Sequence, residues 1–329
     1  MKLIVTGGMG FIGSNFIRIA LANHSDLNVI NIDNLSYGSN TANLADLSHN
    51  PNLRFIRRDI SALTSEDCQD VDAIVNFAAE SHVDRSISNP KSFMDSNAVG
   101  VLNILELCRI NDMDFLQVST DEVYGSSEGQ AFSENDLLTP SSPYSATKAA
   151  ADLLVGSYIR TYRLRAMITR STNNYGPFQF PEKFIPKTII RALGNRSIPV
   201  YGSGKQIRDW LHVTDNCEAI DLVLRNGRRG EVYNIGGGNQ ISNIDVVQQI
   251  LTQLKKPQAL LRHVEDRPGH DFRYHLDSSK MELDFGWKPR IPFSTGLERT
   301  VDWYVNNEVW WRPIATDKAL SEAPWKEKW

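Results

Sequence analysis

Short apolar runs rich in β-branched residues alternate with longer amphipathic stretches through the first half of the chain. The short runs fall at 2–6, 27–32, 53–58, 72–76, 114–118 and 165–169. Between them, apolar residues recur at helical spacing over 11–22, 93–111 and 143–162. This alternation is typical of parallel strands joined by crossover helices. It predicts an α/β fold built on a doubly wound parallel sheet.

The pattern changes after about residue 175, where glycines and prolines separate shorter elements. We therefore expect a larger domain over 1–175 and a smaller α/β lobe over 176–329. Two later segments complicate this division, since 231–235 is typical of a strand that could rejoin the main sheet and 214–226 of a helix that covers it. We accordingly expect parts of 206–240 to belong with the first domain.

Charge and cysteine content narrow the classes of partner. The chain has 35 Lys and Arg against 39 Asp and Glu, so no strong field of one sign favours nucleic acid or an anionic membrane. Its three cysteines fit neither a paired disulfide framework nor a zinc site, which favours reduced thiols and no bound metal. No apolar stretch reaches the roughly 18 residues of a membrane span, and 3–5 runs straight into glycines without room for a signal-peptide core. We expect a cytoplasmic protein that acts on a small molecule.

The first strand is followed by glycines at 7, 10 and 13, immediately before the first helix. Such a turn lets backbone N–H groups and the positive end of the helix approach a pyrophosphate. Asp33 follows the second strand, where a carboxylate can accept hydrogen bonds from an adenosine ribose. No arginine follows Asp33 closely to bind a 2′-phosphate. A structural turn is the alternative, but position, spacing and acid together favour an NAD-binding Rossmann domain.

A second cluster of reactive side chains follows the strand at 114–118. Asp121 and Glu122 come directly after it, at the edge of a parallel sheet where ligands bind. Tyr144 and Lys148 are four residues apart on an expected helix and so share one face. A nearby cation lowers the pKa of a phenol, which predicts that Tyr144 serves as a base. A polar turn and a solvated helix are the alternatives.

These features together resemble the extended short-chain dehydrogenase/reductase superfamily. Five further motifs are similar to those of its dTDP-glucose 4,6-dehydratase family: Asn76–Asp84, Ser119–Gly125, Asn173–Pro177, Gln206–Trp210 and Arg267–Asp271. The most specific is Thr120-Asp121-Glu122, because epimerases of the superfamily lack the acidic pair. The resemblance covers nearly the whole chain.

The resemblance implies a reaction in three stages. Tyr144, supported by Thr120 and Lys148, would take the proton of the sugar 4-OH while hydride leaves C4 for NAD. Glu122 would then remove the C5 proton while protonated Asp121 donates to the departing 6-OH, which requires environments that separate their pKa values. Hydride return to C6 would give a 4-keto-6-deoxy sugar.

The resemblance also implies two sets of contacts. Besides the residues already named, NAD would contact Phe11, Ile12, Asn34, Asp59, Ile60, Phe77, Ala78, Ala79, Ser81, Ser96 and Asn174. Arg208 and Arg267 suit a diphosphate because guanidinium groups donate in pairs. Ser81 and Thr120 would also contact the nucleotide sugar, together with Asn173, Lys183, Phe184, Pro199, Val200, Tyr201, Asn243 and His270.

Three alternatives stay open at this point. A UDP- or CDP-glucose 4,6-dehydratase would use the same chemistry on another nucleotide. A sugar-nucleotide 4-epimerase would need Tyr144 and Lys148 but not the acidic pair, and a non-catalytic NAD-binding regulator would need only the glycine loop. The family likeness further implies a homodimer in which 93–111 and 143–162 pair with their copies in a four-helix bundle.

Overall fold

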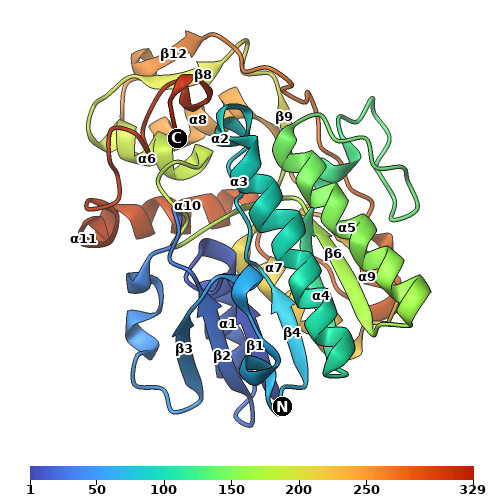
Figure 1. Cartoon of the computed structure of the whole chain (residues 1–329). Coiled ribbons are helices and arrows are strands. Elements are labelled where there is room, and N and C mark those ends of the chain that lie inside the picture. Colours follow the sequence, from blue (N-terminus) through green and yellow to red (C-terminus); the bar gives the residue numbers. More distant parts are fainter.

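The computed structural model describes the whole chain, residues 1–329, as a seven-stranded parallel sheet with helices on both faces and a smaller lobe above its carboxyl edge (Figure 1). The strand order is β10-β6-β5-β4-β1-β2-β3. Every neighbouring pair in this sheet is parallel, which confirms the predicted fold class. The strands of this sheet are β1 (Lys2–Thr6), β2 (Asn28–Asp33), β3 (Leu53–Arg57), β4 (Ala73–Asn76), β5 (Asp114–Thr120), β6 (Ala166–Ser171) and β10 (Val232–Ile235).

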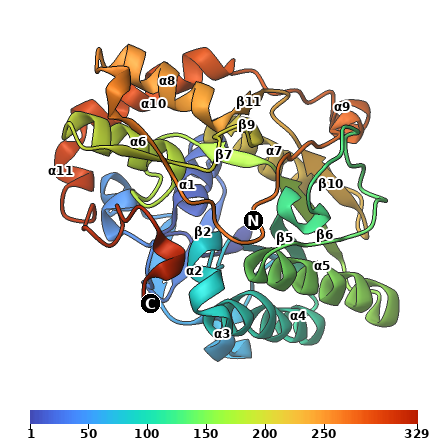
Figure 2. The ribbon, with the colours of Figure 1, turned by 90° about the horizontal axis from the view of Figure 1, so that it is seen from above.

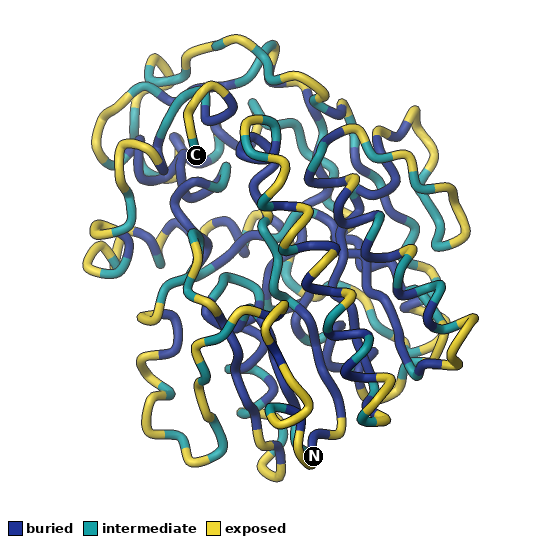
Figure 3. Tube along the Cα trace, viewed as in Figure 1, coloured by how far each residue is buried: buried dark blue, intermediate teal, exposed yellow.

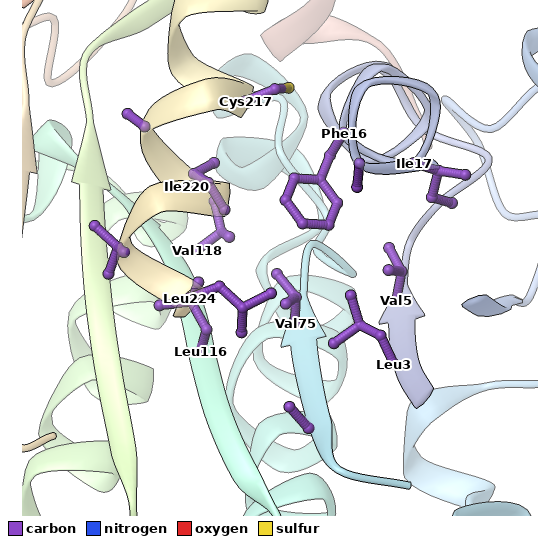
Figure 4. Close-up of a cluster of buried hydrophobic side chains, with 14 of the residues drawn as sticks. Leu3, Val5, Phe16, Ile17, Val75, Leu116, Val118, Cys217, Ile220 and Leu224 are labelled. Atoms are coloured by element: carbon purple, nitrogen blue, oxygen red, sulfur yellow. The ribbon is translucent and has the colours of Figure 1, made fainter. Parts of the chain in front are cut away.

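Alternate side chains of the central strands enter two separate cores. Leu3 and Val5 of β1 point toward α1 (Phe11–Asn23) and α7 (Val213–Asn226), in the core of Figure 4. Ile4 packs on the opposite face, in the core that includes residues of α4 (Gly100–Ile110) and α5 (Pro143–Tyr162). Because both faces are covered, the central strands carry consecutive apolar residues, such as Leu3-Ile4-Val5 of β1, as is typical of buried parallel sheets. The cores stabilise the sheet edge on which the candidate site stands.

The helix predicted over 93–111 is divided. It consists of α3 (Pro90–Met94), a π-helical turn at Asp95–Val99 and α4. Residues of α2 (Val83–Ser88) lie immediately before it. The π turn adds one residue to the local helical repeat, which apolar periodicity alone does not reveal.

The smaller lobe contains two short sheets, β11-β9-β7 and β12-β8. Their strands are β7 (Asn173–Tyr175), β8 (Ile198–Tyr201), β9 (Ile207–His212), β11 (Gln240–Ser242) and β12 (Leu261–Val264). The helices of this lobe are α6 (Phe184–Leu193), α8 (Asn243–Gln253), α10 (Phe293–Asn306) and α11 (Glu308–Trp311), while α9 (Ser279–Phe285) packs against β10 of the main sheet. Figure 2 shows α6, α8 and α10 grouped on one side of the molecule.

The chain returns from the smaller lobe to complete the main sheet. β10 pairs with β6 in parallel register, with Tyr233 opposite Thr169, and α7 packs on α1. Figure 3 shows that the buried strands of the main sheet end in exposed loops at the edge where the N-terminus lies, away from the smaller lobe. None of the helices combines the length and the apolar character that crossing a bilayer demands.

Candidate active site

The glycine loop after β1 has no space for side chains at two of its three repeated glycines. Gly7 has a φ of +70°, and a Cβ there would lie 2.6 Å from the backbone nitrogen of Ala78. A Cβ on Gly13 would lie 2.5 Å from the carbonyl oxygen of Gly7. A Cβ on Gly10 would lie 3.2 Å from the carbonyl oxygen of Gly7, a tight contact that a small shift of the loop could relieve. The loop is thus a cradle of bare backbone at the start of α1, which suits a pyrophosphate.

Asp33 holds the loop from the end of β2. Its carboxylate accepts hydrogen bonds from Met9 N at 3.0 Å, Leu35 N at 2.8 Å and Ser39 Oγ at 2.9 Å. Asp59 is fixed in a similar way, by Ser61 and by the side-chain amide of Asn34 at 2.7 Å. Both acids therefore stand in one orientation before any ligand arrives.

A cleft of about 280 Å³ runs from these acids along the carboxyl edge of the sheet. It is lined by every residue that the sequence predicted to contact NAD: Gly7, Gly10, Phe11, Ile12, Gly13, Asp33, Asn34, Asp59, Ile60, Phe77, Ala78, Ala79, Ser81, Ser96, Tyr144, Lys148 and Asn174. Thr120, Asp121 and Glu122 line the same cleft. The predicted cofactor contacts and the predicted catalytic residues thus share one cavity.

The two neighbouring acids occupy different electrostatic environments. Burial and the adjacent charge of Glu122 raise the pKa of Asp121 to about 8, so this carboxyl is largely protonated at neutral pH. Burial also raises the pKa of Glu122, but the guanidinium groups of Arg267 and Arg208 act in the opposite direction. Cations thus favour the ionised form of Glu122 only. The pair can supply an acid and a base side by side.

The predicted effect of Lys148 on Tyr144 is wrong for this structure. Burial, followed by the charge of Glu122, raises the pKa of the Tyr144 phenol, and only a hydrogen bond from Thr120 lowers it. The Lys148 ammonium donates to the carbonyl oxygen of Val118 at 2.8 Å instead. Burial lowers its own pKa to about 8. Spacing placed both side chains in the cleft but did not reveal that Lys148 binds the backbone of β5.

A second cavity of about 180 Å³ opens beside Glu122 and extends into the smaller lobe. Most of the predicted substrate contacts line it: Ser81, Asn173, Lys183, Phe184, Pro199, Tyr201, Arg208, Asn243, Arg267 and His270. Thr120 lines the first cleft only. Val200 lines neither, because its side chain packs in a small apolar core with Ile198 and Val247, so its contact with the substrate stays a prediction.

Both predicted diphosphate ligands are held by protein groups. Arg208 donates to the carbonyl oxygens of Ile207 at 2.8 Å and Asp271 at 2.9 Å, with its guanidinium 4.3 Å from the centre of the Tyr274 ring. Arg267 donates through Nη1 to Asp84 at 2.6 Å, while its buried Nε has no partner. Each guanidinium is therefore preset in position and retains donors for an anion.

Sequence reasoning missed several side chains that hold the site together. Ser145 Oγ donates to Glu122 at 3.2 Å, and Tyr274 Oη lies 3.4 Å from the same carboxylate. Thr172 Oγ1 lies 2.8 Å from the carboxylate of Asp121. Ser145 could have been found from its place beside Tyr144, one residue into the same helical turn. Tyr274 carries no such signal, because only the fold brings residue 274 next to residue 122.

The sheet order, the glycine cradle and the Tyr144–Lys148 pair in one cleft define a short-chain dehydrogenase/reductase of the extended type. A family model described as GDP-mannose 4,6 dehydratase matches residues 4–300. The low-salt glycan biosynthesis protein Agl12 of Haloferax volcanii is 49% identical, with 94% of this chain and 100% of that protein covered. A dTDP-glucose 4,6-dehydratase of Streptomyces niveus is 45% identical, with 98% of each chain covered.

A solved structure agrees with these relatives. The dTDP-glucose 4,6-dehydratase DesIV of Streptomyces venezuelae, with NAD and TDP bound, superposes with a TM-score of 0.94 at 45% identity. The match covers 95% of this chain and 100% of that one. The chain belongs to the dTDP-glucose 4,6-dehydratase family of NAD-dependent hydro-lyases, which confirms the family predicted from the motifs.

Proposed function

We propose that this chain converts dTDP-glucose to dTDP-4-keto-6-deoxyglucose and water, with NAD as a cofactor that is regenerated in each turnover. The observation that carries the proposal is the Asp121–Glu122 pair, in which Asp121 is buried and Glu122 half-buried, in one cleft with Tyr144 and the glycine cradle. An enzyme that only oxidises and reduces C4 has no use for a second acid and base. Elimination of water across C5 and C6 needs both.

The residues of the chain divide the proton transfers among themselves. Tyr144 must be in its phenolate form to accept the proton of the 4-OH as the C4–H bond breaks. The resulting ketone acidifies C5, whose proton passes to Glu122, while Asp121 gives its proton to the 6-OH so that water leaves from C6. Glu122 finally returns a proton to C5, and the proton taken up by Tyr144 balances, by exchange with solvent, the one that Asp121 gave up. NAD held in the cleft would supply the hydride acceptor for C4 and the hydride donor for C6.

The cofactor assignment fits the residues of the cleft. Backbone N–H groups at the glycine cradle suit the pyrophosphate, and Asp33 stands fixed at the end of β2 for the adenosine ribose. Arg57 lies opposite Asp33 in the register of β2 and β3, and Arg58 follows it. Arg57 donates to the backbone of Asn34, and Arg58 pairs with Asp67. These engagements and the acid itself favour NAD over its 2′-phosphorylated form.

The second cavity suits the nucleoside diphosphate. Arg208 and Arg267 face it with available donors, and Lys183 lies where the two cavities meet. Tyr201 offers an aromatic ring for a base, while Pro199 and Asn243 line the same end. Ser81, Asn173, Phe184 and His270 complete the set. The sugar then lies between this lobe and the acidic pair.

One experiment tests the proposal against its rivals. The purified protein is incubated separately with dTDP-, UDP- and CDP-glucose, and the alkaline absorbance of a 4-keto-6-deoxy sugar is followed. Product from dTDP-glucose alone, or faster than from the others, supports the proposal. Faster product from UDP- or CDP-glucose would reassign the base preference. Interconversion of C4 epimers without loss of water would identify an epimerase.

We further propose a homodimer through α4 and α5. Apolar side chains stand exposed on these helices and on the turn before α4: Val99 at 51%, Leu102 at 40% and Leu153 at 61% of full exposure. Such a stripe favours burial against a second copy in a four-helix bundle. A cytoplasmic location is supported by Cys68, Cys108 and Cys217, three buried thiols that form no disulfide. Size-exclusion chromatography with light scattering tests the dimer.

A further inference from the structure

The last nine residues, Ser321–Trp329, form a strap that crosses from the smaller lobe onto α2. Arg191 of α6 holds its start, donating to the carbonyl oxygen of Leu320 at 2.6 Å and to Glu322 at 2.8 Å. Lys187 donates to the carbonyl oxygen of Ser321 at 3.2 Å. The strap then turns through a short helix at Pro324–Lys326, which packs directly on α2. Figure 2 shows this red segment beside α2, between the smaller lobe and the main sheet.

α2 carries two adjacent side chains that reach different cavities. Asp84 lines the substrate cavity, where it accepts hydrogen bonds from Tyr201 Oη at 2.8 Å and from Arg267 at 2.6 Å. Arg85 lines the cofactor cleft and pairs with Glu80 at 3.1 Å. Neighbouring residues of one short helix thus serve both binding sites.

One tryptophan of the strap contacts Tyr201, the partner of Asp84, and the other contacts Arg85. The Trp325 ring meets Tyr201 edge to face, with centroids 4.8 Å apart and planes at 84°. Asp84 holds the hydroxyl of Tyr201 while Trp325 holds its ring. Trp325 is 8% exposed and lines neither cavity itself.

Trp329 contacts Arg85, which lines the cofactor cleft. The Arg85 guanidinium lies between two rings, 4.1 Å from the centre of Tyr37 and 4.7 Å from the centre of Trp329. Tyr37 and Trp329 also meet edge to face at 5.3 Å. Tyr37 and Arg85 line the cofactor cleft, whereas Trp329 does not. A buried cation between aromatic faces gains stability and loses freedom of movement.

We propose that Trp325 and Trp329 are positioning residues, with Trp325 orienting Tyr201 for the nucleotide of the substrate and Trp329 orienting Arg85 and Tyr37 beside the cofactor. The inference rests on the proposed function for the identity of the two ligands. It assigns separable effects to two residues only four positions apart. A strap that merely stabilises the fold would not separate them.

The test uses binding rather than turnover. Trp325→Leu and Trp329→Leu keep apolar bulk but remove the rings, and Trp325→Phe and Trp329→Phe restore a ring. Affinity for dTDP is measured by calorimetry, and retained NAD is measured after gel filtration. Trp287→Leu is the matched control, since Trp287 packs on the main core and lines neither cavity.

We expect Trp325→Leu to weaken dTDP binding about three- to tenfold, the range of one aromatic pair, with NAD content unchanged. Trp329→Leu should lower retained NAD by a similar factor and leave dTDP affinity unchanged. The Phe variants should recover most of each loss. Effects no larger than those of Trp287→Leu, or parallel changes in both ligands that follow the melting temperature, would overturn the inference.

The same measurements separate this inference from the proposed function. Wild-type protein that binds UDP or CDP in place of dTDP corrects the proposed substrate, and the Trp325 comparison is then made with that nucleotide. Wild-type protein that binds none of the three overturns the substrate half of the inference. If the wild-type protein dehydrates dTDP-glucose and all four strap variants bind both ligands as the wild type does, the positioning role of Trp325 and Trp329 is refuted and the proposed function stands.

Discussion

Ser145 donates a hydrogen bond to Glu122, with 3.2 Å between Ser145 Oγ and the Glu122 carboxylate. The hydroxyl lies in the first turn of α5 and is fully buried. A donor at this place stabilises the ionised form of Glu122, which is the form that removes a proton from C5.

Ser145→Ala should therefore raise the pKa of Glu122. A hydrogen bond to a charged group contributes on the order of 1.5 kcal/mol, which corresponds to about one pH unit. We expect the acid side of the kcat profile to move up by about that amount while kcat at high pH changes little. Ser157→Ala, on the same helix but bonded only to Leu154, is the control. An unchanged profile would show that Ser145 does not support the base.

Glu122→Gln should separate oxidation from elimination. The amide cannot accept the C5 proton, so we expect dehydration to fall by a factor of about 100 or more, with NADH absorbance appearing when dTDP-glucose is added. Tyr144→Phe should instead block the first oxidation, so that neither product nor NADH appears. Exposed Glu128→Gln serves as the control. Dehydration at the wild-type rate in Glu122→Gln would remove Glu122 from the mechanism.

Asp121→Asn should change how stability depends on pH. Burial raises the pKa of Asp121 from its ordinary value of 3.8 to about 8, so between these values the folded state holds a proton that the unfolded state has lost. Wild-type stability should consequently fall as pH rises through this window, by at most about 1.4 kcal/mol per unit, and level off above pH 8.

The asparagine variant does not titrate at this position. Its free energy of unfolding, relative to wild type, should increase from pH 5 to pH 8 and stay constant from pH 8 to pH 9. Urea titrations of both proteins with saturating NAD at these pH values measure the difference. A difference that is the same at pH 5 and pH 8 would mean that Asp121 is ionised in the folded protein at neutral pH.

Gly13→Ala should disrupt the cofactor cradle. The added Cβ would lie 2.5 Å from the carbonyl oxygen of Gly7 and 2.9 Å from Cα of Gly8, so loop and helix must separate. We expect a destabilisation of about 1–3 kcal/mol and at least a tenfold loss of retained NAD. Gly194→Ala has no contact closer than 3.6 Å and should behave as wild type. Full NAD content in Gly13→Ala would show that the close packing is dispensable.

Local patterns in the sequence predicted most of the main sheet. Apolar runs marked six of its seven strands within two residues, because buried parallel strands leave apolar stretches, and the strand expected at 231–235 is confirmed as β10, which rejoins the sheet. The glycines and Asp33 also predicted the cofactor cleft from local sequence, because the spacing of a few neighbouring residues determines the turn after β1. The π turn at Asp95–Val99 could not be predicted, because it leaves no compositional trace.

Side chains supplied from distant parts of the chain could not be predicted in this way. Tyr274 reaches Glu122 across 152 positions, and Asp84 reaches Arg267 across 183. The raised pKa of Tyr144 could not be predicted from the sequence either, because its largest cause is burial, and burial is a property of the assembled fold. Motif resemblance predicted substrate contacts that periodicity did not, but it did not show that the side chain of Val200 packs in a core while its neighbours on β8 line the cavity.

The position of β10 at the edge of the main sheet has a consequence for synthesis on the ribosome. A nascent chain that has emerged only as far as residue 175 has an open strand edge at β6, and it lacks α7 to cover the apolar face beneath α1. The exposed edge can pair with another chain and so promote aggregation until about sixty further residues, which include β10, have been synthesised. Slow translation between 175 and 235 would therefore be more hazardous than a pause of equal length after β10 has paired.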